Sequence, residues 1–95
     1  MDYYVNCSDK ALNEWTYKDA LKIACKWSNE LGCDAVIICE QMQPYHFKNW
    51  KTKRVATRIW REVIREGKII ERINEPVRFL NGEYVSVAEW EEYYK

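Results

Sequence analysis

Glycine, proline and histidine are all scarce in this chain of 95 residues. It has three glycines, two prolines and one histidine. Gly32, Gly67 and Gly82 are each expected at a helix end or in a turn, so none remains for a loop that cradles phosphate groups. His46 is the only histidine, and no nucleophile or second acid–base group near it in sequence completes a catalytic pair. These absences predict a protein that is not an enzyme and has no cofactor.

Close cysteine pairs are also absent. Cys7, Cys25, Cys33 and Cys39 are separated by 18, 8 and 6 positions, without a Cys-x-x-Cys motif. Structural zinc sites generally use such pairs, and a reducing compartment leaves isolated thiols to act as small apolar side chains. The spacing therefore predicts no bound metal and no disulfide.

No apolar run approaches the roughly 20 residues of a membrane span, and the N-terminus lacks the basic start and apolar segment of a signal peptide. We therefore expect a cytoplasmic protein with no membrane partner. Apolar residues make up 47% of the chain and charged residues 32%, which is typical of one globular domain over residues 1–95. No linker or low-complexity run divides it.

The net charge of zero hides an uneven distribution. Residues 1–47 carry −3, residues 48–68 carry +6 and residues 69–95 carry −3. A basic segment on a mildly acidic body favours one specific anionic target over indiscriminate binding to nucleic acid.

The basic segment is predicted to be a helix over Thr52–Glu66. At about 100° per residue, one half of that helix is apolar and would pack on the body. The opposite side would carry a basic stripe formed by Lys51, Arg54, Arg58, Arg61, Arg65 and Lys68.

The other elements follow from periodicity, caps and turn residues. Strands are expected over Tyr3–Cys7, Leu12–Trp15, Asp34–Met42, Lys68–Ile73, Val77–Leu80 and Glu83–Val85. Thr16 with Asp19 and Ser86 with Glu89 are capping boxes that predict a helix after each hairpin. Asn81-Gly82 is a strong two-residue hairpin turn, while Pro44 is expected to end a strand and open an aromatic-rich loop over Gln43–Lys51.

The resulting order is ββαβαβββα. It predicts an α+β fold with a small antiparallel or mixed sheet, two main helices on one face and a short C-terminal helix.

A second interpretation makes residues 34–41 a helix. Arg65-Glu66-Gly67-Lys68-Ile69-Ile70-Glu71-Arg72 resembles the helix-to-wing junction of winged helix-turn-helix domains, which would make the basic helix a DNA-recognition helix. The β-branched run Val36-Ile37-Ile38 favours a strand instead.

The basic stripe and the loop before it form the candidate binding surface. Arginine favours bidentate contacts with carboxylate or phosphate groups, and an aromatic ring beside cations can stack on a base or anchor in a protein pocket. The candidate partner-binding residues are Arg54, Arg58, Arg61, Arg65, Lys51, Trp50, Lys48 and Lys68.

We therefore expect a small non-enzymatic binding protein that docks on an acidic or nucleic-acid-handling protein, which could be part of a nucleoprotein. In size, lack of motifs and aromatic content, the chain is similar in type to small phage-encoded inhibitors of host machinery, including anti-CRISPR proteins. The alternative is a nucleic-acid-binding domain of winged-helix type with DNA or RNA as its partner.

Overall fold

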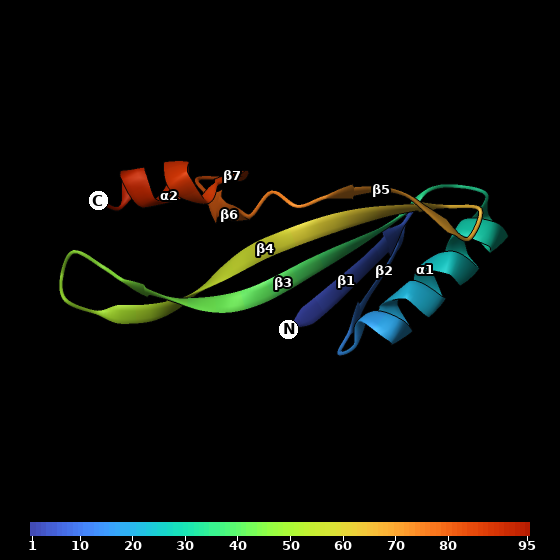
Figure 1. Cartoon of the computed structure of the whole chain (residues 1–95), viewed down its shortest axis with the longest axis horizontal. Helices are drawn as coiled ribbons and strands as arrows, with labels where there is room; N and C mark the ends of the chain where they lie inside the picture. The colour runs from blue at the N-terminus through green and yellow to red at the C-terminus, as the bar shows by residue number, and fades with distance from the viewer.

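The computed structural model describes all 95 residues. They form seven strands and two helices, joined by turns and loops. Figure 1 shows the two helices at opposite ends of the molecule. In chain order the elements are β1 (Asp2–Cys7), β2 (Lys10–Glu14), α1 (Tyr17–Leu31), β3 (Ala35–His46), β4 (Thr52–Arg65), β5 (Lys68–Ile73), β6 (Val77–Leu80), β7 (Glu83–Ser86) and α2 (Val87–Tyr93). The α+β class is confirmed, but the order ββαβαβββα is wrong because one predicted main helix is a strand.

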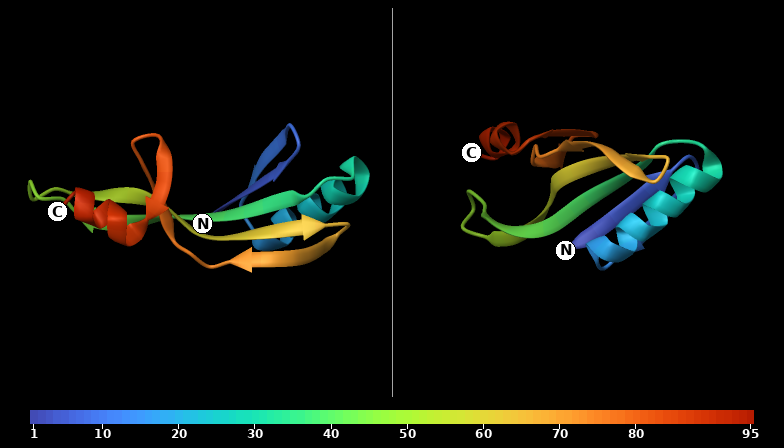
Figure 2. Two further views of the ribbon diagram at one scale, coloured as in Figure 1. Left: turned by 90° about the horizontal axis from the view of Figure 1, so that it is seen from above. Right: turned by 45° about the vertical axis from the view of Figure 1, so that its right-hand side comes forward.

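One antiparallel sheet contains all seven strands, in the order β2-β1-β3-β4-β6-β7, with β5 also paired to β4. The long hairpin β3–β4 is its spine. The molecule measures 49 × 21 × 21 Å, and the tip of this hairpin projects at one end (Figures 1 and 2). β5 and β6 lie end to end along the outer edge of β4, where β5 pairs with Arg61–Arg65 and β6 with Arg58.

The predicted basic helix over Thr52–Glu66 is wrong. Residues Thr52–Arg65 form β4, which pairs with β3 over its whole length. The segment is rich in Thr, Val, Ile and Trp, which favour a pleated sheet surface, and a strand here supplies the partner that β3 needs. Sheet pairing therefore overrides the helical spacing of the apolar residues.

A β-bulge at Ile59 explains why the apolar pattern resembles a helix. Cys39 of β3 is opposite Trp60, but Glu40 is opposite Arg58, so Ile59 is an extra residue in β4. A bulge shifts the alternation of side chains by one position. The apolar residues of β4 consequently lose the period of two by which a strand is normally recognised.

The predicted strand Asp34–Met42 is confirmed but ends later, at His46. Pro44 lies inside β3 and does not end it. β1 pairs with β3 only as far as Glu40, so beyond that point one edge of β3 is unpaired and tolerates a residue without an N–H group. Because residues 35–46 and 52–65 are strands, the winged-helix interpretation is wrong.

The α1 end contains the main apolar core. α1 packs on β1, β3 and β4, with Val5, Ala20, Ala24, Ala35, Ile37 and Ile64 all fully buried. Thr16 caps the helix by accepting a hydrogen bond from the Asp19 amide, and Gly32 ends it at φ 64°. These predicted boundaries are confirmed.

The α2 end contains a cluster of aromatic rings around a buried arginine. Trp90 of α2 packs edge-on against Tyr45 of β3, with ring centroids 4.9 Å apart. Arg78 of β6 is 4% exposed; its Nε donates to Thr57 Oγ1 at 2.8 Å and its guanidinium lies 4.7 Å from the Trp90 ring. Thus a buried cation and aromatic rings, rather than aliphatic side chains, join α2 and β6 to the spine.

Two tight turns determine the hairpins on the outer edge of β4. Asn81 and Gly82 both have positive φ, which confirms the predicted β6–β7 hairpin. Glu66 and Gly67 also have positive φ, so Gly67 forms the β4–β5 turn and not the predicted helix end. The predicted cap of α2 is confirmed, because Ser86 accepts a hydrogen bond from the Glu89 amide.

Candidate functional site

The four arginines of β4 lie on one face of the strand, although the strand replaces the predicted helix. Arg54, Arg58, Arg61 and Arg65 alternate with the side chains that face α1, and the bulge at Ile59 keeps both pairs on the same side. Their register partners confirm this, because Pro44, Glu40 and Ile38 are even-numbered positions of β3, whereas the α1 core uses odd-numbered positions. We call the side of the sheet that carries these arginines the open face.

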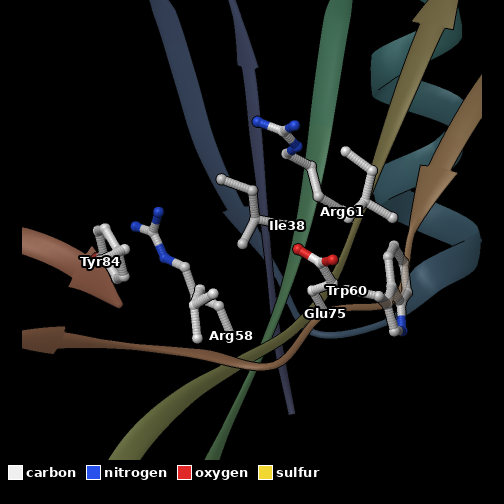
Figure 3. A pocket seen from close by; sticks show the side chains of 8 residues that line it. Ile38, Arg58, Trp60, Arg61, Glu75 and Tyr84 are labelled. Carbon is white, nitrogen blue, oxygen red and sulfur yellow. The ribbon is translucent and has the colours of Figure 1, made fainter. Parts of the chain in front are cut away.

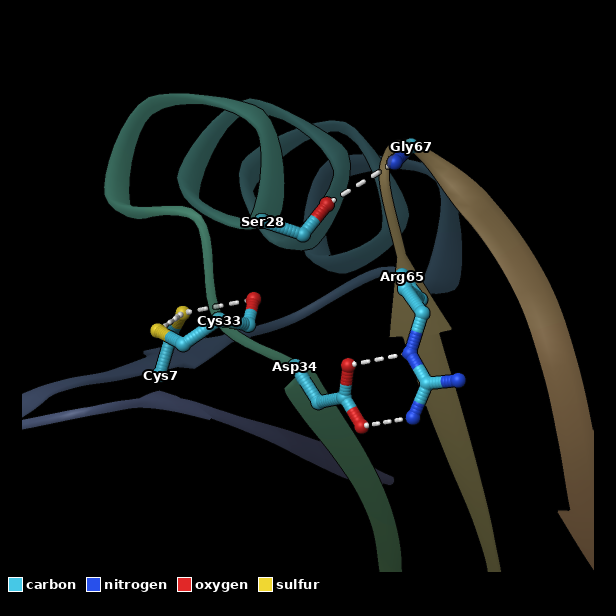
Figure 4. Close-up of polar contacts among 6 residues, drawn as sticks. All are labelled: Cys7, Ser28, Cys33, Asp34, Arg65 and Gly67. Carbon is cyan, nitrogen blue, oxygen red and sulfur yellow. Dashed lines mark hydrogen bonds and ion pairs between the residues drawn. The ribbon is translucent and has the colours of Figure 1, made fainter.

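The four arginines differ in what holds them. Arg65 is committed to Asp34 through two hydrogen bonds of 2.9 Å, and this contact lowers the pKa of Asp34 (Figure 4). Arg58 lies 3.7 Å from Glu40 and stacks over Tyr84 with its guanidinium 4.0 Å from the ring centroid. Arg54 donates to the Met42 carbonyl at 3.4 Å. Arg61 makes no ion pair or hydrogen bond, so it is the arginine most available to a partner.

A hollow of about 330 Å³ lies beside Arg61, where the open face reaches the outer edge of β4 and residues 73–77. In Figure 3 the side chains of Arg58 and Arg61 extend on either side of Ile38. The hollow is lined by Ile38, Arg58, Trp60, Arg61, Ile73, Glu75, Val77 and Tyr84. It therefore combines aliphatic side chains, two aromatic rings, two guanidinium groups and the carboxylate of Glu75. The Nε atom of Arg58 is buried and has no hydrogen-bond partner.

Sequence reasoning missed the apolar half of this hollow. The sequence predicts Ile38 in a strand that is apolar on both faces, and Val77 and Tyr84 in the two arms of a hairpin, but it does not indicate that these side chains meet. The available signal was the alternation along residues 35–40, which separates Ala35 and Ile37 from Val36 and Ile38. That alternation predicts two apolar faces, but it does not say that a helix covers only one of them.

The other predicted site residues lie elsewhere. Lys48, Trp50 and Lys51 are in the loop 47–51 at the tip of the β3–β4 hairpin, and Lys68 begins β5 beside the β4–β5 turn. The structure therefore does not bring the eight candidates into one stripe. It separates them into the open face, the hairpin tip and the β4–β5 turn.

Two side chains that could take part in acid–base chemistry, His46 and Glu62, have partners away from the open face. His46 Nδ1 lies 3.0 Å from Thr52 Oγ1, and its ring is edge-on to Trp50. Glu62 is 2% exposed, and its Oε2 lies 3.7 Å from the Arg72 guanidinium at the side of the sheet that faces α1. Neither group lies in the hollow on the open face.

The cysteines form no metal cluster. No group of three or more His, Cys, Asp or Glu residues is placed to hold a metal ion. Cys7 and Cys33 have their Sγ atoms 3.1 Å apart near the end of α1 (Figure 4), and burial raises the pKa of Cys7 to about 11. All four thiols are free. That the purified protein has no bound metal and no disulfide remains a prediction.

No helix in the structure is long and apolar enough to cross a membrane. No protein-family model, curated protein or solved structure matches the chain. The features that bear on function are therefore the geometry of the open face and that of the hairpin tip.

Proposed function

We propose that this chain is a small non-enzymatic binding protein whose open face docks on a protein partner with an anionic surface. The observation that carries the proposal is Arg61, a guanidinium without an acidic partner at the rim of a partly apolar hollow. A partner carboxylate could form a bidentate contact with it while an apolar side chain enters the hollow.

The composition of the hollow supports a protein partner. Arginine and tyrosine are enriched at the buried centres of protein interfaces, which are also more apolar than the surrounding rim. Acidic side chains also lie on this face: Asp34 and Glu40 each pair with an arginine, and Glu75 lines the hollow. These acids would repel a continuous phosphate backbone, whereas a protein can place one carboxylate opposite Arg61.

We infer that the chain acts by occupying its partner's surface and not by modifying the partner chemically. This mode fits the likeness in type to phage-encoded inhibitors such as anti-CRISPR proteins. Residues 52–65 form a strand, so the chain has no recognition helix of the winged-helix type. We therefore do not propose nucleic-acid binding of that type.

The proposal is tested with matched baits, the wild-type chain and Arg61→Glu. Arg61 makes no ion pair, so the variant is expected to keep the wild-type melting temperature. It should lose its partner, because the charge reversal replaces an attraction with a repulsion. Pulldown from the native host identifies the proteins that wild type retains and Arg61→Glu does not, and calorimetry on the purified partner should give a dissociation constant at least about tenfold weaker.

The control is Lys22→Glu, which makes the same charge change on the exposed side of α1. It should bind as wild type does. Arg58→Glu is a poorer probe, because it places a second carboxylate beside that of Glu40 and removes the contact with Tyr84. A purified partner that binds wild type and Arg61→Glu equally would contradict the proposal.

A further inference from the structure

The tip of the β3–β4 hairpin is an ordered turn that displays one aromatic ring. The Phe47 amide donates to the Lys51 carbonyl at 2.7 Å, and the Trp50 amide donates to the Phe47 carbonyl at 3.0 Å. The Asn49 side chain accepts a third hydrogen bond, from the Lys51 amide at 3.3 Å. Three hydrogen bonds within residues 47–51 therefore hold this loop.

Trp50 occupies an unfavourable backbone conformation within this turn. Its φ is +67°, a region that bulky residues rarely adopt, and its side chain is 86% exposed. A ring that served the core would be covered. Its neighbour Phe47 is covered in this way, because it packs edge-on against Trp90 and Tyr94. The fold thus partly covers Phe47 and displays Trp50.

The charged residues closest to Trp50 in the sequence are all positive. Lys48, Lys51, Lys53 and Arg54 lie within four residues of it, and residues 41–61 contain six Lys or Arg and no Asp or Glu. No second large apolar side chain of the loop is exposed beside the ring. Anchors of protein interfaces generally lie within a wider apolar patch, whereas a single ring flanked by cations suits a flat, polyanionic ligand.

We propose that this tip is a second binding site, for single-stranded nucleic acid. The Trp50 ring stacks on an unpaired base, and Lys48 and Lys51 contact the adjacent phosphates. A duplex is a poorer ligand because its base faces are already stacked on one another. His46, edge-on to the Trp50 ring at 5.7 Å, limits the rotation of the indole and holds it outward.

This site is separate from the open face around Arg61. Thr52 and Arg61 are nine residues apart on one strand, which is about 30 Å at roughly 3.3 Å per residue. That separation is several times the Debye length at physiological salt, so charge changes at one site have little effect at the other. A protein with an anionic surface and a nearby single strand, as in a nucleoprotein, would engage both sites.

The experiment measures the fluorescence anisotropy of a labelled 12-nucleotide oligo-dT and a labelled oligo-U against the full chain. Trp50→Ala should weaken binding by about tenfold or more, because it removes one stacked base, and Trp50→Phe should recover part of the loss. In a salt titration, Lys48→Ala combined with Lys51→Ala should reduce the slope of log K against log salt by about 1.4. Arg61→Glu should leave the affinity within about twofold of wild type.

Two further ligands distinguish the alternatives. The oligo-dT annealed to oligo-dA should bind more weakly than the single strand, and poly-glutamate should bind in a manner that does not depend on Trp50. Equal oligonucleotide affinities for wild type and Trp50→Ala would overturn the proposal. Poly-glutamate binding that is lost in Trp50→Ala, without any loss of oligonucleotide binding, would instead make the tip a surface for acidic proteins. The oligonucleotide test is independent of the proposed role of Arg61, because both Trp50 variants keep Arg61. The Trp50 proposal can therefore be right even if the Arg61 proposal is wrong.

Discussion

The two ends of the molecule are held together by different physical forces. Under α1, six aliphatic side chains form the core, and the buried carboxylate of Glu62 lies on the same side of the sheet, 3.7 Å from the Arg72 guanidinium. Under α2, aromatic rings surround Arg78, which bonds to Thr57 and to Gln43 of the spine at 2.8 and 3.1 Å. Both helices follow a β-hairpin and both begin at a hydroxyl cap, so the local sequence signals are similar while the packing beneath them is not.

This difference predicts different modes of failure. Apolar packing under α1 joins three strands and a helix, so losing it should unfold the whole chain. The α2 end meets the spine through one backbone pairing, Arg58 with Val77, through the contacts of Arg78 and Trp90, and through the rings of Tyr84 and Tyr94. Losing those contacts should release β6, β7 and α2 while the rest stays folded. The free end of the hairpin would then be exposed without global unfolding.

The largest expected effect is that of Ile37→Ala. Ile37 is 0% exposed at the centre of the α1 core, and truncating it leaves a cavity that costs about 2–5 kcal/mol of unfolding free energy. Chemical denaturation followed by far-UV circular dichroism should show one transition at lower denaturant, and hydrogen exchange should accelerate at both ends. Acceleration confined to α1 would show that the two ends do not unfold together. Ile38→Ala, on the open face, is the matched control and should cost much less.

A smaller, local effect is expected for Arg78→Met. Methionine fills the space without a charge, but it leaves Thr57 Oγ1 and Gln43 Oε1 without their donor, at a cost of about 1–3 kcal/mol. Hydrogen exchange should accelerate in β6, β7 and α2 and stay slow in α1. Arg54→Met, on an exposed arginine of the same spine, serves as control. Acceleration in α1 as large as that in α2 would show that the far end is not a separate unit.

Local signals predicted the ends of elements better than the elements themselves. Thr16, Gly32, Ser86 and the Asn81-Gly82 turn act through backbone hydrogen bonds and φ values within a few residues, so the sequence alone was sufficient to place them. The identity of residues 52–65 depends on pairing with β3 and β5, which are up to 30 positions away. Propensity and period cannot include that pairing, and the bulge at Ile59 removed the alternation that would have indicated a strand.

The bulge at Ile59 also explains why the sequence correctly grouped the four arginines of the candidate site. A helix places positions 54, 58, 61 and 65 on one side, and so does a strand with one extra residue between 58 and 61. The grouping of the arginines therefore survived a wrong secondary structure. The commitment of Arg65 to Asp34, and the hollow that joins β3 to β7, depend on tertiary contacts and could not be predicted.

The smallest expected effects compare the two helix caps directly. Thr16→Ala and Ser86→Ala each remove one side-chain acceptor, for the amides of Asp19 and Glu89, and each should cost about 1 kcal/mol at its own helix. Because α1 is part of the main core, Thr16→Ala should lower the global melting temperature by roughly 4–8 °C. Ser86→Ala should change that temperature much less and should instead accelerate hydrogen exchange in α2, whose opening precedes global unfolding. Thr16→Ser and Ser86→Thr, which keep the acceptor, are the controls and should behave nearly as wild type. Equal shifts in melting temperature for the two alanine variants would mean that both ends unfold in a single transition and that the polar contacts of Arg78 couple α2 to the spine as firmly as the apolar core couples α1.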